Sequence, residues 1–217
     1  MIVALGRMNW HAKLKRDLSR IDQSLRRTSK ESRVALSKLE LMVLVLEDRR
    51  FLGHVGVDIL SVAREVIKLA AGRKYGGAST IDMQFVRTVT GYRAHTLKRK
   101  LYEALLAILI QFRYGKIDIL ESYLACAYFG SGLSGAEMAA QKVFGKAANE
   151  LSLTEAAFVS AMLAHPRPSN APLVWECRIR ARAAYAMEVY MSRKLRLRRQ
   201  SRSPLIVRPS ENRVNIL

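Results

Sequence analysis

The sequence predicts an all-α protein built around one domain. Two observations predict this class: apolar residues recur at helical spacing along most of the chain, and the alternation typical of β-strands is almost absent. At 217 residues the chain is long enough for one well-buried domain. Glycines and capping residues separate the apolar segments, and the pair Ser152 and Glu155 predicts one helix start. The predicted helices span residues 33–46, 58–71, 81–88, 96–114, 117–129, 135–144, 153–164 and 175–191.

The first thirty residues predict a basic amphipathic helix, because Leu14, Leu18, Ile21 and Leu25 recur at helical spacing among lysines and arginines. Such a helix either lies on a membrane through this apolar face or packs on the domain with a solvated basic face. We therefore divide the chain into a basic N-terminal segment (1–32), a domain (33–191) and a basic tail (192–217). We expect the tail to be disordered because of its composition.

The charge of the chain indicates an anionic partner or surface. Thirty-seven Lys and Arg against 18 Asp and Glu give a net charge of +19. An anionic membrane leaflet and a diphosphate-linked lipid both fit this charge. Nucleic acid is a less favoured partner, because the chain has no zinc-finger spacing and no aromatic-rich RNA-binding motif. Cys126 and Cys177 decide nothing about compartment.

One carboxylate follows a segment that should be buried. Residues 41–46 are all apolar, and Glu47 comes directly after them. Burial and the negative end of a helix dipole both disfavour the ionised form of such a carboxylate, so Glu47 is a candidate general base near neutral pH. On these residues alone, an ordinary solvated turn that closes a core helix is the favoured interpretation.

Five further segments follow the EDRRFLGH segment at 47–54 in a defined order. They read GGASTIDMQ (76–84), RKLYE (99–103), ILESYL (119–124), AAQKVFGK (139–146) and LSLTEAA (151–157). Each segment alone is weak, but the ordered set resembles glycosyltransferase family 51, the peptidoglycan transglycosylase domain of penicillin-binding proteins and of monofunctional biosynthetic transglycosylases. The resemblance covers residues 36–172 and implies a lysozyme-like all-α fold. No Ser-x-x-Lys pattern with a downstream Lys-Thr-Gly occurs, so the resemblance implies a monofunctional chain.

The resemblance implies an inverting glycosyltransferase that polymerises lipid II into β-1,4-linked glycan strands and releases undecaprenyl diphosphate. Glu47 would be its base and Glu103 its second essential carboxylate, near the donor diphosphate. The residues that the resemblance places at the substrate are Asp48, Phe51, His54, Ser79, Thr80, Gln84, Arg87, Arg99 and Lys100. No cofactor is required, although a divalent cation such as Mg or Mn fits a diphosphate; its ligands are not assigned.

The resemblance also implies partners and a location. The partners are lipid II, the growing glycan strand, an anionic membrane surface and other cell-wall synthesis proteins. The location is the periplasmic or outer face of the bacterial inner membrane, with peripheral attachment. Monofunctional members usually carry an N-terminal anchor, whereas this chain shows neither a signal peptide nor the ~20 apolar residues of a spanning helix.

The local chemistry adds three expectations. A helix start at Ser79 and Thr80 exposes backbone amides that can bind phosphate, and Asp82 in its first turn opposes an anion there. The helix that carries Glu103 should be buried through a set of large apolar side chains. These are Leu105, Ile108, Leu109 and Phe112.

Two alternative functions stay open. One is a lysozyme-like peptidoglycan hydrolase, which Arg87, Arg99 and Lys100 argue against because a hydrolase needs no diphosphate cradle. The other is a non-catalytic protein that binds lipid II or scaffolds cell-wall enzymes.

Overall fold

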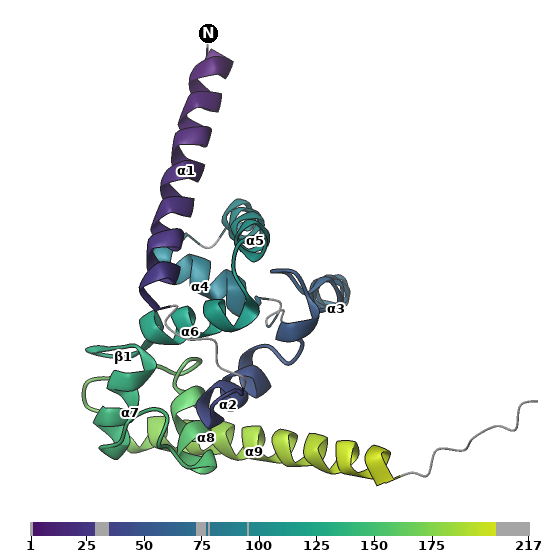
Figure 1. Ribbon diagram of the computed structural model, residues 1–217, viewed down its shortest axis with the longest axis vertical. Helices are drawn as coiled ribbons and strands as arrows, with labels where there is room; N and C mark the ends of the chain where they lie inside the picture. Colours follow the sequence, from purple (N-terminus) through teal and green to yellow (C-terminus); the bar gives the residue numbers. More distant parts are fainter. Residues whose placement is uncertain (1, 29–34, 73–76, 78, 95, 203–217) are drawn as a thin grey trace, which may run out of the picture.

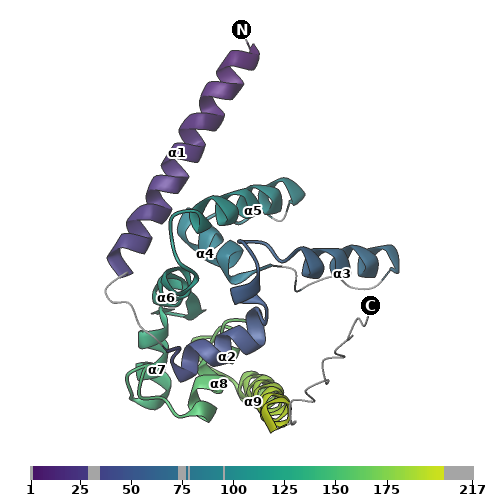
Figure 2. The ribbon, with the colours of Figure 1, turned by 45° about the vertical axis from the view of Figure 1, so that its right-hand side comes forward.

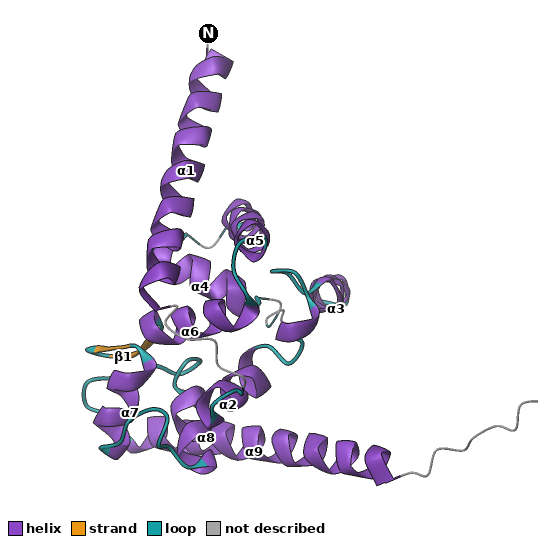
Figure 3. Cartoon of the chain, viewed as in Figure 1, coloured by secondary structure: helices purple, strands orange, loops and turns teal. Residues whose placement is uncertain are grey.

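The computed structural model describes residues 2–28, 35–72, 77, 79–94 and 96–202. Within them the chain is mainly α-helical, which confirms the predicted class (Figures 1 and 3). The helices are α1 (Ile2–Thr28), α2 (Lys38–Glu47), α3 (Ile59–Ala70), α4 (Ile81–Thr90), α5 (Leu97–Gln111), α6 (Lys116–Cys126), α7 (Ala136–Phe144), α8 (Leu153–Ala161) and α9 (Leu173–Arg202). A 3-10 turn, η1 (Phe51–Gly53), follows α2.

Most helix boundaries fall within a few residues of the predicted ones because the capping residues are present. Ser37 with Glu40 and Ser152 with Glu155 each form a reciprocal capping box. Helix α6 ends at Cys126, before the predicted end at 129, because residues 128–130 form the strand β1 (Tyr128–Gly130). This strand pairs antiparallel with β2 (Leu133–Ser134) in a small two-stranded sheet.

The C-terminal helix is longer than predicted. Helix α9 continues to Arg202, so the helix end predicted at 191 is wrong, and residues 192–202 of the predicted tail extend a helix that projects from the domain (Figure 1). Leucines and arginines with high helix propensity favour this continuation. Residues 203–217 of the predicted tail lie outside the described residues, as do Gly76, Ala78, His95 and the predicted boundary at 32.

The core has two parts that meet at the loop after α2. Helix α8 packs on α2 and α9, while α4 packs on α6 and α5. The first group is buried through side chains such as Met42 and Ala157, and the second through Phe85 and Leu120. Because α2 ends where the two groups meet, its last residue, Glu47, lies beside α4 and α9.

Helix α1 packs on the domain through the apolar face that the sequence indicates. Ile21 and Leu25 are fully buried, and Leu14 and Leu18 pack against the core from the same face. The helix contacts α6 and α4, while its N-terminal part extends away from the domain (Figures 1 and 2). The structure therefore adopts the second predicted arrangement. Ile21 and Leu25 do not enter a membrane, because they are already buried in protein, and Leu14 and Leu18 are partly covered by the same core.

Helix α5 is buried through a different face from the predicted one. Leu106 and Ile110 are buried, whereas Phe112 is 78% exposed. Leu105 and Ile108 are also exposed, so the prediction that this set buries the helix is wrong. Glu103 still faces inward, because it lies on the same face as Leu106 and Ile110. An apolar stripe along the outer face of α5 is left in solvent.

Candidate active site

Glu47 ends α2 and is held from two sides. Arg182 on α9 donates from Nη2 to Glu47 Oε1 at 2.8 Å, and Gln84 on α4 donates from Nε2 to Oε2 at 3.3 Å. The hydroxyl of Tyr123 donates to Gln84 Oε1 at 2.7 Å, which fixes the amide so that its NH2 group points at Glu47. The Glu47 side chain is 14% exposed. Each carboxylate oxygen thus has one hydrogen-bond donor. The carboxylate is held in one orientation and stays accessible to a ligand.

Arg182 was not identified from the sequence. It lies 135 residues after Glu47 and is one of several arginines in α9, of which Arg178, Arg180 and Arg193 are exposed. What distinguishes it is the position of Ile179, Ala183 and Ala186, which are buried and fix the rotation of the helix about its axis. The only sequence signal was the apolar spacing of these three residues, which indicates the buried side of α9 but not the partner of Arg182.

The loop after Glu47 orients the start of α4. Asp48 is buried, and its Oδ2 lies 3.0 Å from His54 Nε2 and accepts from the amide of Ile81 at 3.1 Å. Thr80 caps the same helix by accepting from the amide of Met83 and donates to the carbonyl of Gly56 at 2.6 Å. The expectation of exposed phosphate-binding amides at this helix start is therefore wrong for Ile81 and Met83, whose amides already have protein acceptors.

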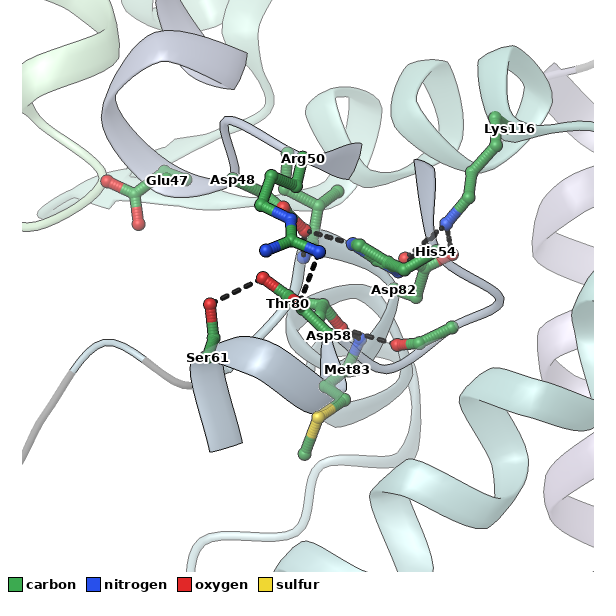
Figure 4. Close-up of polar contacts among 12 residues, drawn as sticks. Glu47, Asp48, Arg50, His54, Asp58, Ser61, Thr80, Asp82, Met83 and Lys116 are labelled. Carbon is green, nitrogen blue, oxygen red and sulfur yellow. Dashed lines mark hydrogen bonds and ion pairs between the residues drawn. The ribbon is translucent and has the colours of Figure 1, made fainter. Parts of the chain in front are cut away.

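Asp82 does not face the site, which corrects the expectation that it opposes an anion there. Its side chain is fully buried and turned toward Lys116, whose Nζ lies 2.9 Å from Oδ2, as Figure 4 shows. Gln111 also donates to Asp82 at 2.5 Å. Burial raises the pKa of Asp82, although the charges of Lys116 and His54 oppose this shift. The carboxylate and its cation form an internal pair that leaves little net charge at the helix start.

Several residues assigned to substrate contact are occupied by protein partners, although Asp48 and Thr80 also line the cavity at Glu47. Phe51 is 1% exposed, and the ammonium of Lys116 lies 4.4 Å from its ring centroid. His54 is nearly buried against Asp48, and Thr80 is buried as a cap. In this arrangement Asp48, His54 and Thr80 hold the loop and α4 in place, because their polar atoms contact protein partners (Figure 4). Phe51 contributes by packing in the core.

Glu103 is fully buried and holds two arginines. Its Oε1 lies 3.3 Å from Nε of Arg87 on α4 and 3.3 Å from Nε of Arg99, one turn earlier on α5. Arg87 remains 35% exposed, and its Nη2 lies 3.5 Å from the hydroxyl of Ser79. Helix α4 therefore connects the two carboxylates: Gln84 contacts Glu47, and Arg87 contacts Glu103 one turn later.

A cavity of about 670 Å³ opens beside Glu47. Its wall carries cationic side chains from the loop after α2, from α3 and from α9, and nearly as many carboxylates. The cations are Arg49, Arg50, Arg64, Lys68 and Arg193, and the carboxylates are Glu47, Asp48, Asp58 and Glu65. Three of these cations pair with Asp58 or Glu65, so the cavity is strongly polar with little excess of positive charge. Glu103 does not line this cavity, so of the two glutamates only Glu47 can meet a ligand in it directly.

A divalent cation does not fit the one group of ligand atoms that could hold it. Within the described residues, Asp48, His54 and Asp82 each place a ligand atom within 4.8 Å of the others. However, Lys116 Nζ lies 2.9 Å from Asp82 and 3.5 Å from His54 Nδ1, so an ammonium already contacts two of the three residues and pairs with the Asp82 carboxylate. We therefore derive no step through a metal bound at these residues.

The site thus consists of one ordered carboxylate, Glu47, on the wall of a polar cavity in a mainly α-helical domain. The transglycosylase family model matches residues 15–190, and the chain belongs to this family.

The similar proteins include penicillin-binding protein 1A of Aquifex aeolicus, 44% identical over 57% of this chain and 17% of that protein. Biosynthetic peptidoglycan transglycosylases of Shewanella denitrificans and of a Marinomonas species are 38% and 37% identical, over 60% and 61% of this chain and 57% and 59% of theirs. The chain thus matches less than two thirds of each of these relatives.

Proposed function

We propose that this protein is a peptidoglycan glycosyltransferase that polymerises lipid II into β-1,4-linked glycan with inversion and releases undecaprenyl diphosphate. The observation that carries the proposal is the ordered Glu47 on the wall of a polar cavity, with the Arg87–Glu103–Arg99 cluster one turn further along α4. Family membership and the names of the relatives support it. Incubation of the purified chain with labelled lipid II tests it, and glycan strands are the expected product.

In this mechanism Glu47 takes the proton of the acceptor 4-hydroxyl while that oxygen forms a bond to the anomeric carbon of the donor. The bond from the anomeric carbon to the diphosphate breaks on the opposite face, which inverts the configuration. Arg87 and Arg99 stabilise the charge that develops on the leaving diphosphate, because guanidinium groups bind phosphate oxygens in a bidentate way. Lys100, at the start of the same helix, adds to this positive field.

The two alternatives predict different products. A hydrolase would cleave finished peptidoglycan and would not need the arginine cluster on Glu103. A non-catalytic binder would retain lipid II without consuming it. The ordered base in an open cavity favours turnover over binding alone, and the absence of any product from lipid II would favour the binder.

Replacing Arg182 with Ala should lower kcat by about tenfold or more and change KM for lipid II little, because a hydrogen bond between charged groups that orders the base is lost. Arg182→Lys should restore part of kcat, since it keeps the charge. Arg180→Ala is the matched control, because Arg180 lies on the same helix and pairs with Glu176 at the surface, away from Glu47. Equal kcat in the Arg182→Ala and Arg180→Ala variants would contradict the role.

We also propose that the protein attaches to an anionic membrane surface through the outer faces of α3 and α5. Among the described residues no helix is long and apolar enough to cross a membrane. Helices α3 and α5 project from the same side of the molecule (Figures 1 and 2). Both carry exposed apolar side chains, such as Ile59 and Ile67 on α3, beside basic residues such as Arg64 and Lys68.

Sedimentation with vesicles tests this attachment. Binding to anionic vesicles should fall steeply as salt rises, because each basic residue near the surface contributes ~1 kcal/mol and is screened within ~8 Å at physiological salt. The double variant Ile59→Glu, Ile67→Glu should bind less, whereas Leu173→Glu, which changes an exposed leucine on α9, should bind like the wild type. Vesicle binding that does not change with salt would contradict the proposed surface. Equal binding by the double variant and by Leu173→Glu would also contradict it.

A further inference from the structure

An apolar groove of about 680 Å³ lies between α1 and α5, outside the cavity at Glu47. Its lining includes Trp10 from α1, Tyr102 from the base, and Leu97 and Leu101 from the outer face of α5. Leu101 is 63% exposed. The ring of Trp10 packs edge-on against that of Tyr102, with 5.1 Å between centroids. Exposed apolar side chains gathered in a concave surface are typical of a ligand site.

The base of this groove is rigid. Asp17 is fully buried and accepts from the hydroxyls of Tyr92 and Tyr102 at 2.6 Å and 2.9 Å. The ammonium of Lys13 lies 4.4 Å from the centroids of both rings. Burial, together with the bond to Asp17, raises the pKa of Tyr92 to about 12, so that its hydroxyl stays a donor at neutral pH. The aromatic floor therefore exists before any ligand binds.

One end of the groove reaches the arginine cluster. Arg99 lines the groove, and its Nε lies 3.3 Å from Glu103, which also holds Arg87. Lys98 lines the same end. A long apolar surface thus leads directly to the guanidinium groups that we assign to the leaving diphosphate. The ligand that matches both parts has an anionic head and an extended apolar chain.

We propose that this groove binds the prenyl chain of a lipid diphosphate donor, with Arg99 at the boundary between the diphosphate and the chain. This inference rests on the proposed function, since it places the carrier part of the same substrate. Trp10 and Lys13 precede residues 15–190, so α1 supplies a wall that lies outside the part matched by the family model. A bilayer phospholipid is a weaker candidate, because glycerol and ester groups separate its phosphate from its acyl chains, whereas in a prenyl diphosphate the phosphate that would pair with Lys98 and Arg99 is bonded directly to the apolar chain.

The fluorescence of Trp10 tests the proposal without turnover. The chain contains two tryptophans, so Trp175→Phe leaves Trp10 as the sole indole. Titration of this full-length variant with farnesyl diphosphate, a short water-soluble prenyl diphosphate, should shift the Trp10 emission to shorter wavelength and saturate, because the chain displaces water from the indole. Inorganic diphosphate should compete for Arg99 without causing the shift. Farnesol should shift the emission only at much higher concentration.

Two variants locate the binding. Leu101→Glu should weaken farnesyl diphosphate by about tenfold or more, since it removes apolar contact and places a carboxylate beside an anionic ligand. Leu173→Glu, an exposed leucine on α9, should leave the titration unchanged. Arg99→Ala should weaken farnesyl diphosphate but not farnesol. If Leu101→Glu proves unstable to heat, Leu97→Glu replaces it, because Leu97 is equally open to solvent.

Each contrary result overturns the inference. If Trp10 does not shift, or shifts equally with farnesol and farnesyl diphosphate, the groove is not a site for prenyl diphosphates. Equal effects of Leu101→Glu and Leu173→Glu on the titration would lead to the same conclusion. The titration needs no catalysis, so it separates the two proposals. Glycan synthesis without a Trp10 shift would contradict prenyl binding in the groove but not the glycosyltransferase activity. A Trp10 shift in a chain that makes no glycan would contradict the glycosyltransferase activity but not prenyl binding.

Discussion

Glu47→Gln should lower the rate of glycan synthesis from lipid II by about 10²–10⁴-fold, the contribution typical of a general base. The amide has the size of the carboxylate and keeps an oxygen that accepts from Arg182, but it cannot take a proton at neutral pH. We therefore expect wild-type circular dichroism and an unchanged melting temperature. Quantifying glycan by gel after a fixed time measures the loss.

Glu188→Gln is the control for this variant. Glu188 is exposed on α9, and the same isosteric change there should leave the rate unchanged. Glycan synthesis by Glu47→Gln at the rate of this control would remove Glu47 from the role of base. A loss of activity accompanied by a lower melting temperature would instead indicate a structural role.

The positions of the helices could be predicted from local signals, because periodicity and caps are properties of neighbouring residues. Ser152 and Glu155 are one example: they predicted the start of α8 and form the capping box observed there. The end of α6 could not be predicted in this way. Its last predicted turn continues the apolar pattern, but Tyr128 pairs with Ser134 in the small sheet, an interaction with no signal before residue 128.

Which face of a helix is buried was harder to predict where both faces are apolar. On α5 one stripe contains Leu106 and Ile110 and another contains Leu105 and Phe112, so periodicity alone fits both. The buried set is decided by contact with α4, which brings Arg87 to Glu103. The inward position of Glu103 is therefore a result of packing.

The partners of the charged groups at the site were the least predictable part. Local reasoning treated Glu47 as a carboxylate at an apolar helix end, but Arg182 approaches it from 135 residues away. It treated Asp82 as a charge facing the ligand, but Lys116 pairs with it inside the domain. Ion pairs of this kind depend on how distant helices meet, and a single sequence does not encode that in its local pattern.

Glu103→Gln should reduce both stability and activity, in contrast to Glu47→Gln. Glu103 is fully buried between Arg87 and Arg99, so a neutral amide leaves two guanidinium groups with one weak acceptor. We expect a loss of about 2–3 kcal/mol in the free energy of unfolding, less than for a completely buried pair because Arg87 can regain water. For a chain of this size that lowers the melting temperature by roughly 5–10 °C.

The surface pair Glu176 and Arg180 provides the comparison. Glu176→Gln breaks an exposed i,i+4 pair and should lower the free energy of unfolding by only ~0.3–0.5 kcal/mol.

If Glu103 holds Arg87 and Arg99 in position to bind the diphosphate, Arg99→Ala should weaken donor binding even when the variant folds normally. Unchanged donor affinity in Arg99→Ala would refute the assignment of the leaving group to this cluster. A wild-type melting temperature for Glu103→Gln would show that the buried carboxylate is not what keeps Arg87 and Arg99 in place.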